Sequence, residues 1–227
     1  MKTLKPGPGV VEGYLGSVPL LAGLDAQRLQ RLAACSFLRL YDRGDVLFTT
    51  GRSALELLWL AHGAVRVFRL LPDGRERVIH IHPAPSLVAE VPTLLGQPYP
   101  ASADCTAPST VVAVPRAQLV ELVRADPELS LRLLAASMDR LRELTRAVAH
   151  QGRLSALSRV AAYLLGLAAH HSELSLPAPK KDVASLLGLT PESLSRALTT
   201  LRKRGAIEMS ESEIRLVDRG SLESLLV

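Results

Sequence analysis

Three side chains that can exchange specific hydrogen bonds lie close together near the end of the chain. Glu192, Ser195 and Arg196 have the spacing E-x-x-S-R, which places them on one face of a helix. The guanidinium fork of Arg196 matches the two acceptors of a guanine edge, and the Glu192 carboxylate can accept from a cytosine amino group. The spacing therefore predicts base-edge readout in a major groove.

Basic and hydroxyl side chains surround this group. Between Leu176 and Ile207 six residues are basic and two are acidic, so this stretch carries +4, against +5 for all 227 residues. Lysine and arginine suit phosphate oxygens. The expected contacts to a nucleic-acid backbone are Lys180, Lys181, Thr190, Ser193, Thr199 and Arg202.

Two short helices must position these side chains. Residues 180–188 (KKDVASLLG) predict the first helix, and Gly188 permits the turn after it. Thr190 supplies an N-cap and Pro191 a first helical residue for the second helix, which ends at Gly205. This helix-turn-helix pattern is followed by two short strands, at 206–209 and 213–217, that predict a hairpin wing. The side chains expected to close the angle between the helices are Val183, Ala184, Leu187, Leu189, Leu194 and Ala197.

The alternative for this stretch is a surface helical hairpin whose lysines and arginines are only solvated. The wing favours the helix-turn-helix interpretation, because winged helices commonly use such a hairpin to touch the nucleic-acid backbone.

Short strands fill the region from Phe37 to about Val114. Period-two alternation recurs in DVLFTT, LELLWLA, AVRVFRLL, RERVIHIH and TVVAVP, and Asp73-Gly74 predicts a hairpin turn. Many short strands separated by turns favour a β-sandwich or a small jelly-roll barrel. The other elements expected around the barrel are a loose extension at 1–16, an amphipathic helix at 25–34 and a helix at 116–123.

A long uninterrupted helix is predicted over Glu128–Gly152. Its narrow apolar stripe is typical of the seam of a two-stranded coiled coil and predicts a homodimer. The alternative is a helix laid over the chain's own barrel. The hinge expected after it is 151–155, with a packing helix at 157–169 and a connecting loop at 173–179. The expected seam residues are Leu131, Leu134, Met138, Leu141, Thr145 and Val148.

Composition limits the class of protein. Residues are 48% hydrophobic but only 4% aromatic, which predicts cores of leucine, valine and alanine. Cys35 and Cys105 are too few for a disulfide scaffold or a four-cysteine cluster and are expected as free thiols in a reducing cytoplasm. The first residues lack the apolar region of a signal peptide, and the longest apolar run, Val160–Ala169, is too short to span a membrane. We therefore expect a soluble, cytoplasmic protein without a membrane partner.

The combination of β-roll, long helix and winged helix resembles the Crp/Fnr family of bacterial transcription regulators. The most specific stretch is LGLTPESLSRALTTLRKRGAIE, which is similar to the Fnr-type recognition helix. The resemblance implies an α+β fold and a non-enzymatic homodimer that reads TTGA half-sites, with double-stranded DNA and RNA polymerase as partners. It implies an effector-sensing β-roll of the cyclic-nucleotide-binding-like jelly-roll type at 17–125, a dimerisation helix at 126–152 and a winged helix-turn-helix domain at 153–227.

The barrel departs from the nucleotide-binding members of that family. Those members carry F-G-E followed by R-S/T-A, where the arginine pairs the cyclic phosphate and the glutamate takes the ribose hydroxyl. Here Glu90 remains, but Pro100 stands at the arginine position, and we expect nothing nearby to replace the arginine. This argues against a cyclic nucleotide, and the absence of cysteine from residues 1–34 argues against the iron–sulfur cluster of Fnr. The expected effector-pocket residues are Glu90, Pro100 and Ser102.

The string AEVPTLLGQPYPASA is similar to the Dnr-like branch, whose members respond to nitric oxide with haem as the proposed cofactor. Haem therefore stays open, and a small-molecule-responsive or effector-independent regulator is the alternative. Strand alternation predicts Ile79 and Ile81 on the buried face and His80 with His82 at the surface. The sequence does not select among the candidate axial ligands His62, His80, His82, His150, His170 and His171.

A metalloenzyme is a remote alternative. Gly74-x5-His80-x-His82 resembles the first metal motif of cupins, because paired histidines on one strand face have sound ligand geometry. Glu90 follows too far along the chain, and no histidine lies between His82 and His150. The missing third ligand disfavours this alternative, and no metal site is expected.

Overall fold

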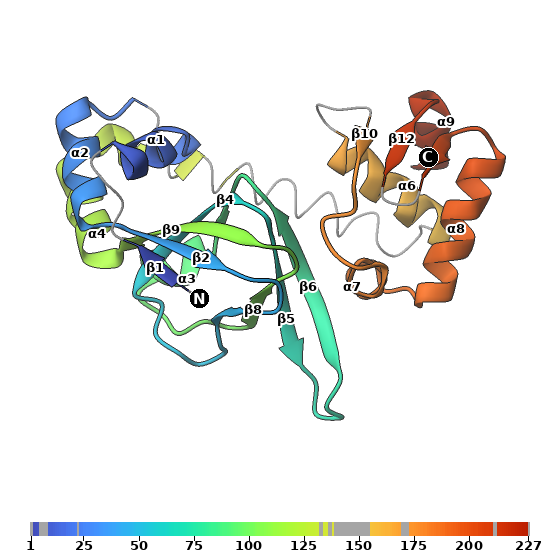
Figure 1. Ribbon diagram of the computed structural model, residues 1–227, viewed down its shortest axis with the longest axis horizontal. Coiled ribbons are helices and arrows are strands. Elements are labelled where there is room, and N and C mark those ends of the chain that lie inside the picture. Colours follow the sequence, from blue (N-terminus) through green and yellow to red (C-terminus); the bar gives the residue numbers. More distant parts are fainter. Residues whose placement is uncertain are drawn as a thin grey trace. The chain divides into compact units, whose positions relative to one another are not determined.

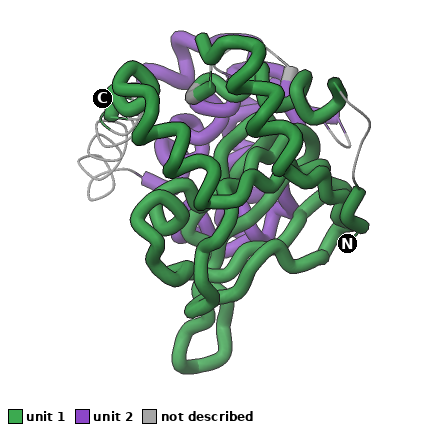
Figure 2. The backbone as a smooth tube through the Cα atoms, turned by 90° about the vertical axis from the view of Figure 1, so that its left-hand side faces the viewer, with its two compact units in different colours: residues 1–141 green, residues 142–227 purple. Residues whose placement is uncertain are grey.

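The computed structural model describes residues 2–4, 9–21, 23–131, 134–135, 138, 155–168, 173–210 and 213–226. The chain divides into two units, Met1–Leu141 and Arg142–Val227 (Figure 2). The first unit contains the β-roll and the second contains the winged helix, so the expected α+β class is confirmed.

Two antiparallel sheets form the β-roll. The strands predicted from alternation are confirmed, and Asp73-Gly74 closes a hairpin that projects from the rest of its unit (Figure 1). The five-stranded sheet has the order β1 (Lys2–Leu4), β2 (Phe37–Tyr41), β9 (Ser109–Pro115), β4 (Glu56–His62) and β7 (Ser86–Val88). The four-stranded sheet has the order β3 (Val46–Phe48), β8 (Ser102–Cys105), β5 (Ala64–Leu70) and β6 (Glu76–Pro83).

Helices cover one face of the five-stranded sheet, and the other face lines the interior of the roll. The alternation in β4 explains both faces: Leu57 and Trp59 belong to the core under the helices, whereas Leu58 and Leu60 belong to the core between the sheets. Figure 1 shows the covering helices gathered at one end of the unit. They are α1 (Val10–Gly16), α2 (Ala26–Cys35) and α4 (Arg116–Ala125), while α3 (Glu90–Leu95) follows β7.

The described part of residues 1–16 differs from the expected loose extension. β1 pairs with β2 at the edge of the sheet, and Val11 and Leu15 of α1 are buried in the core under the helices. Residues four apart lie on the same face of a helix, so Val11 and Leu15 can both enter this core. The prolines and glycines just before Val10 concealed this pattern.

Strand β6 breaks the alternation expected of it. Val67 pairs with His80 but Phe68 pairs with Val78, so Ile79 is the extra residue of a β-bulge. The prediction that Ile79 is buried is wrong, because its side chain is 46% exposed. His80 and His82 are half-buried rather than at the surface, and their rings meet edge to face with centroids 4.2 Å apart.

The second unit holds the two predicted helices and the wing. Its helices are α6 (Ala156–Leu167), α7 (Lys180–Leu186), α8 (Pro191–Lys203) and α9 (Arg219–Glu223). Its sheet has the order β10 (Glu173–Leu174), β12 (Ile214–Leu216) and β11 (Ile207–Met209). The hairpin wing is confirmed, but the expected connecting loop at 173–179 begins with a strand, since Leu174 pairs with Ile214. A strand of two residues has no alternation by which sequence could reveal it.

The predicted helix at 128–152 lies only partly within the described residues. Leu131, Leu134 and Met138 are helical, with exposures of 66%, 53% and 49%. Leu141, Thr145 and Val148 lie outside the described residues, as does most of the hinge. No helix in the described ranges is both long and apolar enough to cross a membrane.

Candidate nucleic-acid interface

The turn between α7 and α8 has the geometry that the sequence predicts. Gly188 adopts a φ of +63°, a left-handed conformation that glycine reaches without the steric cost of a Cβ. The Leu189 amide donates to the Ala184 carbonyl at 2.8 Å. Thr190 then caps α8, its hydroxyl accepting from the Ser193 amide at 3.2 Å, and Pro191 occupies the first turn.

Apolar side chains fix the angle between the two helices. Val183 and Ala184 of α7 and Leu194 and Ala197 of α8 are buried, while Leu187 and Leu189 are half-buried. The alanines are small where the helix backbones approach. The further buried side chains of this core are Val160, Leu164, Leu198, Leu201 and Ile207.

The opposite face of α8 is polar and open. Glu192, Ser195, Arg196 and Thr199 are exposed, and Ser193 is half-exposed. The predicted base-reading side chains therefore share one accessible helix face, on the side of α8 away from the core. An exposed face that carries a carboxylate, a hydroxyl and a guanidinium can both donate to and accept from base edges.

A chain of hydrogen bonds orients Arg196. The Thr190 hydroxyl donates to the Ser193 oxygen at 3.2 Å, and the same oxygen accepts from Arg196 Nη2 at 3.2 Å. The guanidinium is thus held over the first turn of α8. Sequence reasoning placed Ser193 at the nucleic-acid backbone and missed this second contact, which only the i,i+3 spacing to Arg196 could have indicated.

Glu192 is poised as an anion. Hydrogen bonding from its own backbone amide, together with the charge of Arg196, holds the pKa of the Glu192 carboxyl below its usual range. The ionised carboxylate only accepts hydrogen bonds. It therefore suits a donor such as an exocyclic amino group.

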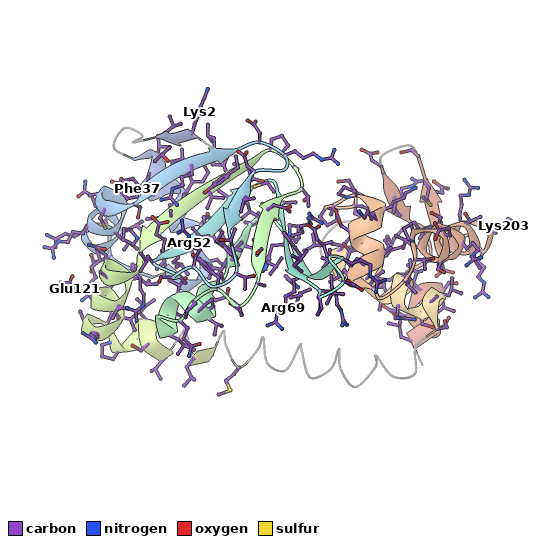
Figure 3. The ribbon with its side chains drawn as sticks, turned by 90° about the horizontal axis from the view of Figure 1, so that it is seen from below. Lys2, Phe37, Arg52, Arg69, Glu121 and Lys203 are labelled. Carbon is purple, nitrogen blue, oxygen red and sulfur yellow. The ribbon has the colours of Figure 1, made fainter. Side chains whose placement is uncertain are left out.

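Basic side chains flank this face on both helices. Lys180 and Lys181 are exposed in the first turn of α7, and Arg202 and Lys203 are exposed in the last turn of α8. Figure 3 shows Lys203 at the surface of its unit. These cations have the reach and charge for phosphate oxygens on either side of a groove.

The expected effector-pocket residues make separate contacts. Glu90 begins α3, and the Ser102 hydroxyl accepts from the Thr50 amide at 3.0 Å. Pro100 is exposed, and its carbonyl accepts from Arg69 Nε at 3.1 Å (Arg69 is labelled in Figure 3). The expectation that no basic residue stands near Pro100 is therefore wrong. Arg69 could not be identified from the sequence, because it lies 31 residues away, on β5.

Two cavities of the first unit are lined by other residues. One, of about 590 Å³, contains the bidentate Arg39–Glu56 pair (2.6 and 2.7 Å) and the stacked rings of Phe48 and Tyr99, with centroids 3.9 Å apart. Burial raises the pKa of Tyr99 to about 12, so its phenol stays protonated. Arg39, Phe48 and Glu56 come from β2, β3 and β4, and Tyr99 comes from the segment between α3 and β8. No local sequence motif could therefore have predicted this group.

The second cavity, of about 740 Å³, is lined by His62 together with Tyr14 and Pro85. The His62 and Tyr14 rings meet edge to face with centroids 5.9 Å apart. The candidate ligands His150, His170 and His171 lie outside the described residues. Within the described ranges, no three or more His, Cys, Asp or Glu side chains converge as a metal site.

Comparison with known proteins identifies one family in each of the two units. Residues 158–225 match the Crp-like helix-turn-helix domain, and residues 38–126 match the cyclic nucleotide-binding domain. The chain is 30% identical to the nitrogen fixation regulation protein FixK of Azorhizobium caulinodans, over 88% of this chain and 83% of that protein.

Solved structures agree with this match. FixK2 from Bradyrhizobium japonicum aligns with a TM-score of 0.76 at 26% identity, covering 84% of this chain and 96% of that chain. DNR from Pseudomonas aeruginosa aligns with a TM-score of 0.54 at 29% identity, covering 95% and 97%. The relatives are regulators rather than metalloenzymes, so the cupin alternative is rejected. The chain belongs to the Crp/Fnr family of DNA-binding transcription regulators.

Proposed function

We propose that the protein binds a TTGA-type palindrome as a homodimer and reads each half-site through Glu192, Ser195 and Arg196. The observation that carries this proposal is the polar face of α8, where these side chains are exposed and Arg196 is held by Ser193 at 3.2 Å. Oriented side chains lose less conformational freedom when they bind.

The chemistry of the three side chains suits this half-site. Arg196 would donate both arms of its fork to the O6 and N7 atoms of the guanine, and Glu192 would accept from a cytosine amino group on the opposite strand. Ser195, with a hydroxyl that donates and accepts, would contact either neighbour. Phosphate contacts fix the register, and base contacts supply the discrimination.

The proposed phosphate contacts are Lys180, Lys181, Thr190, Ser193, Thr199 and Arg202. We expect the Lys180→Ala substitution to weaken binding to all duplexes alike and to lower the slope of log affinity against log salt by about 1 for each half-site. Fluorescence anisotropy at several salt concentrations measures both quantities. The matched control is Lys2→Ala, which removes a lysine from exposed β1 in the other unit (Figure 3). A loss confined to one DNA sequence would contradict the assignment to phosphate.

Dimerisation is proposed through the helix assigned to residues 126–152. Leu131, Leu134 and Met138 recur at spacings of three and four and remain exposed in the single chain, as an unpaired seam would. Two recognition helices about one turn of DNA apart would then match a palindrome. The β-roll at 17–125 and the winged helix at 153–227 complete the proposed domain organisation.

Control is proposed to run through the β-roll as a population shift between conformations that fit and do not fit the operator. RNA polymerase is the proposed protein partner, and the cytoplasm the proposed compartment. Haem is the cofactor that the resemblance to the Dnr-like branch suggests. Among the described histidines, His62 would hold the haem iron, because it lines a cavity of about 740 Å³ together with apolar residues such as Ala84 and Pro85.

An absorption spectrum tests the haem proposal. Protein purified from cells supplied with a haem precursor should show a Soret band that shifts with nitric oxide and is lost in a His62→Ala variant. A colourless protein that still binds the operator would instead favour a small-molecule-responsive or effector-independent regulator.

A further inference from the structure

One arginine outside the exposed face reaches the turn that precedes α8. Arg159, in the first turn of α6, donates from Nη1 to the Leu187 carbonyl at 2.9 Å, with the Gly188 carbonyl 3.5 Å from the same nitrogen. A Cβ on Gly188 would lie 3.4 Å from that nitrogen. The guanidinium therefore lies directly against the turn.

The contact has a clear electrostatic reason. The last carbonyls of a helix have no partner within the helix and form the negative end of its dipole. Leu187 is the C-cap of α7, so its carbonyl belongs to that end. A guanidinium donor there makes a charge-assisted hydrogen bond, stronger than one between neutral groups.

Packing restricts where this guanidinium can go. Arg159 is half-buried, next to the fully buried Val160. Its Nε is buried and has no hydrogen-bond partner among the residues that the structure describes. The Nη1 contacts with the turn are therefore the polar contacts that define the position of the side chain.

We infer that Arg159 is a positioning residue for base readout. It ties α6 to the end of α7, and the next residues in the chain are Leu189 and the Thr190 cap that sets the start of α8. The direction of the first turn of α8, and so of Glu192 and Arg196, depends on that tie. Arg159 contacts no base in this proposal, which rests on the proposed function of α8.

Location along the chain gives the contact a further role. In sequence, α6 is the first described element after the proposed dimerisation helix. A movement of α6 would be transmitted to the turn through a hydrogen bond between two packed elements. In that case Arg159 would pass a movement of α6 to the start of α8.

Two substitutions at this position test the inference in the full-length protein. Arg159→Met keeps an unbranched apolar chain and removes the donor, whereas Arg159→Lys keeps one cationic donor. The matched control is Arg219→Met, since Arg219 Nη1 also donates to a helix-terminal carbonyl, that of Ala168, at 3.4 Å, but away from the turn.

The first readout is the ratio of affinities for a TTGA palindrome and an unrelated duplex. Arg159→Met should lower this ratio about tenfold, which is the lower end of what the loss of a charge-assisted hydrogen bond costs, while affinity for the unrelated duplex and its salt slope stay unchanged. Arg159→Lys should recover part of the ratio. Arg219→Met should lower the thermal midpoint without changing the ratio.

The second readout needs no DNA. Amide hydrogen exchange at residues 187–190 and at Glu192 should be faster in Arg159→Met than in the unsubstituted protein and unchanged in Arg219→Met. Equal losses for both duplexes, or unchanged exchange in the turn, would overturn the positioning role. Failure of the unsubstituted protein to discriminate between the duplexes would reject the proposed function, while the exchange data would still decide whether Arg159 holds the turn.

Discussion

Replacing Arg196 with alanine should cost about 1–3 kcal/mol at each TTGA half-site, roughly a 5- to 150-fold loss of affinity per contact. The loss should concentrate at one base-pair position, because the guanidinium fork reads a single guanine. Affinity for operators already mutated at that position should change little. Fluorescence anisotropy across a set of single-base operator variants gives the full profile.

Two further variants distinguish the loss of a base contact by Arg196 from the mere loss of a positive charge. Arg202→Ala removes an exposed cation from the last turn of the same helix and should weaken all duplexes alike. Ser193→Ala removes the oxygen that holds Arg196 Nη2 at 3.2 Å and should give a smaller loss at the same base pair, together with a small loss on all duplexes from its proposed phosphate contact. If Arg196→Ala lowers affinity equally for every sequence, Arg196 contacts phosphate and the readout assignment is wrong.

Charging the proposed seam should have the largest effect of any single substitution. Leu131→Glu places a carboxylate where two copies of an apolar helix face would meet, and each buried leucine side chain contributes about 1.5–3 kcal/mol. Loss of the dimer removes the gain from linking two half-sites, which is about 10²- to 10⁴-fold. We therefore expect a monomer with at least about a hundredfold weaker operator binding.

The chain offers a close control for this experiment. Leu55 is 67% exposed, against 66% for Leu131, but it lies in the β-roll just before β4. Leu55→Glu makes the same chemical change at equal exposure and should leave both the mass and the operator affinity unchanged. Sedimentation equilibrium measures the mass. A Leu131→Glu protein that remains dimeric would place the interface elsewhere.

Local patterns were sufficient to predict the helix-turn-helix. Gly188, Thr190 and Pro191 each act on their own stretch of backbone, and the apolar spacing of α7 and α8 follows from helix geometry alone. The same holds for the hairpin at Asp73-Gly74 and for most strands of the roll. These features need no knowledge of what lies across the core.

Features that depend on a distant partner were missed. The bulge at Ile79 arises from the register between β5 and β6, and Arg69 meets Pro100 only because β5 and β8 are neighbours. Arg159 was not identified for the same reason, since its partners are 28 and 29 residues away. In the sequence, the only sign of this role is that Arg159 is a single arginine just before the apolar run of α6.

Strand β10 has a consequence for protein engineering. An isolated two-stranded ribbon is marginally stable in water, and here Glu173–Leu174 supply a third strand beside β12. A chimaera that exchanges residues 206–217 with those of a relative would replace β11 and β12 but keep this chain's own β10 beside them. Such a graft should carry residues 173–174 with it, because the exchangeable module is discontinuous in the chain.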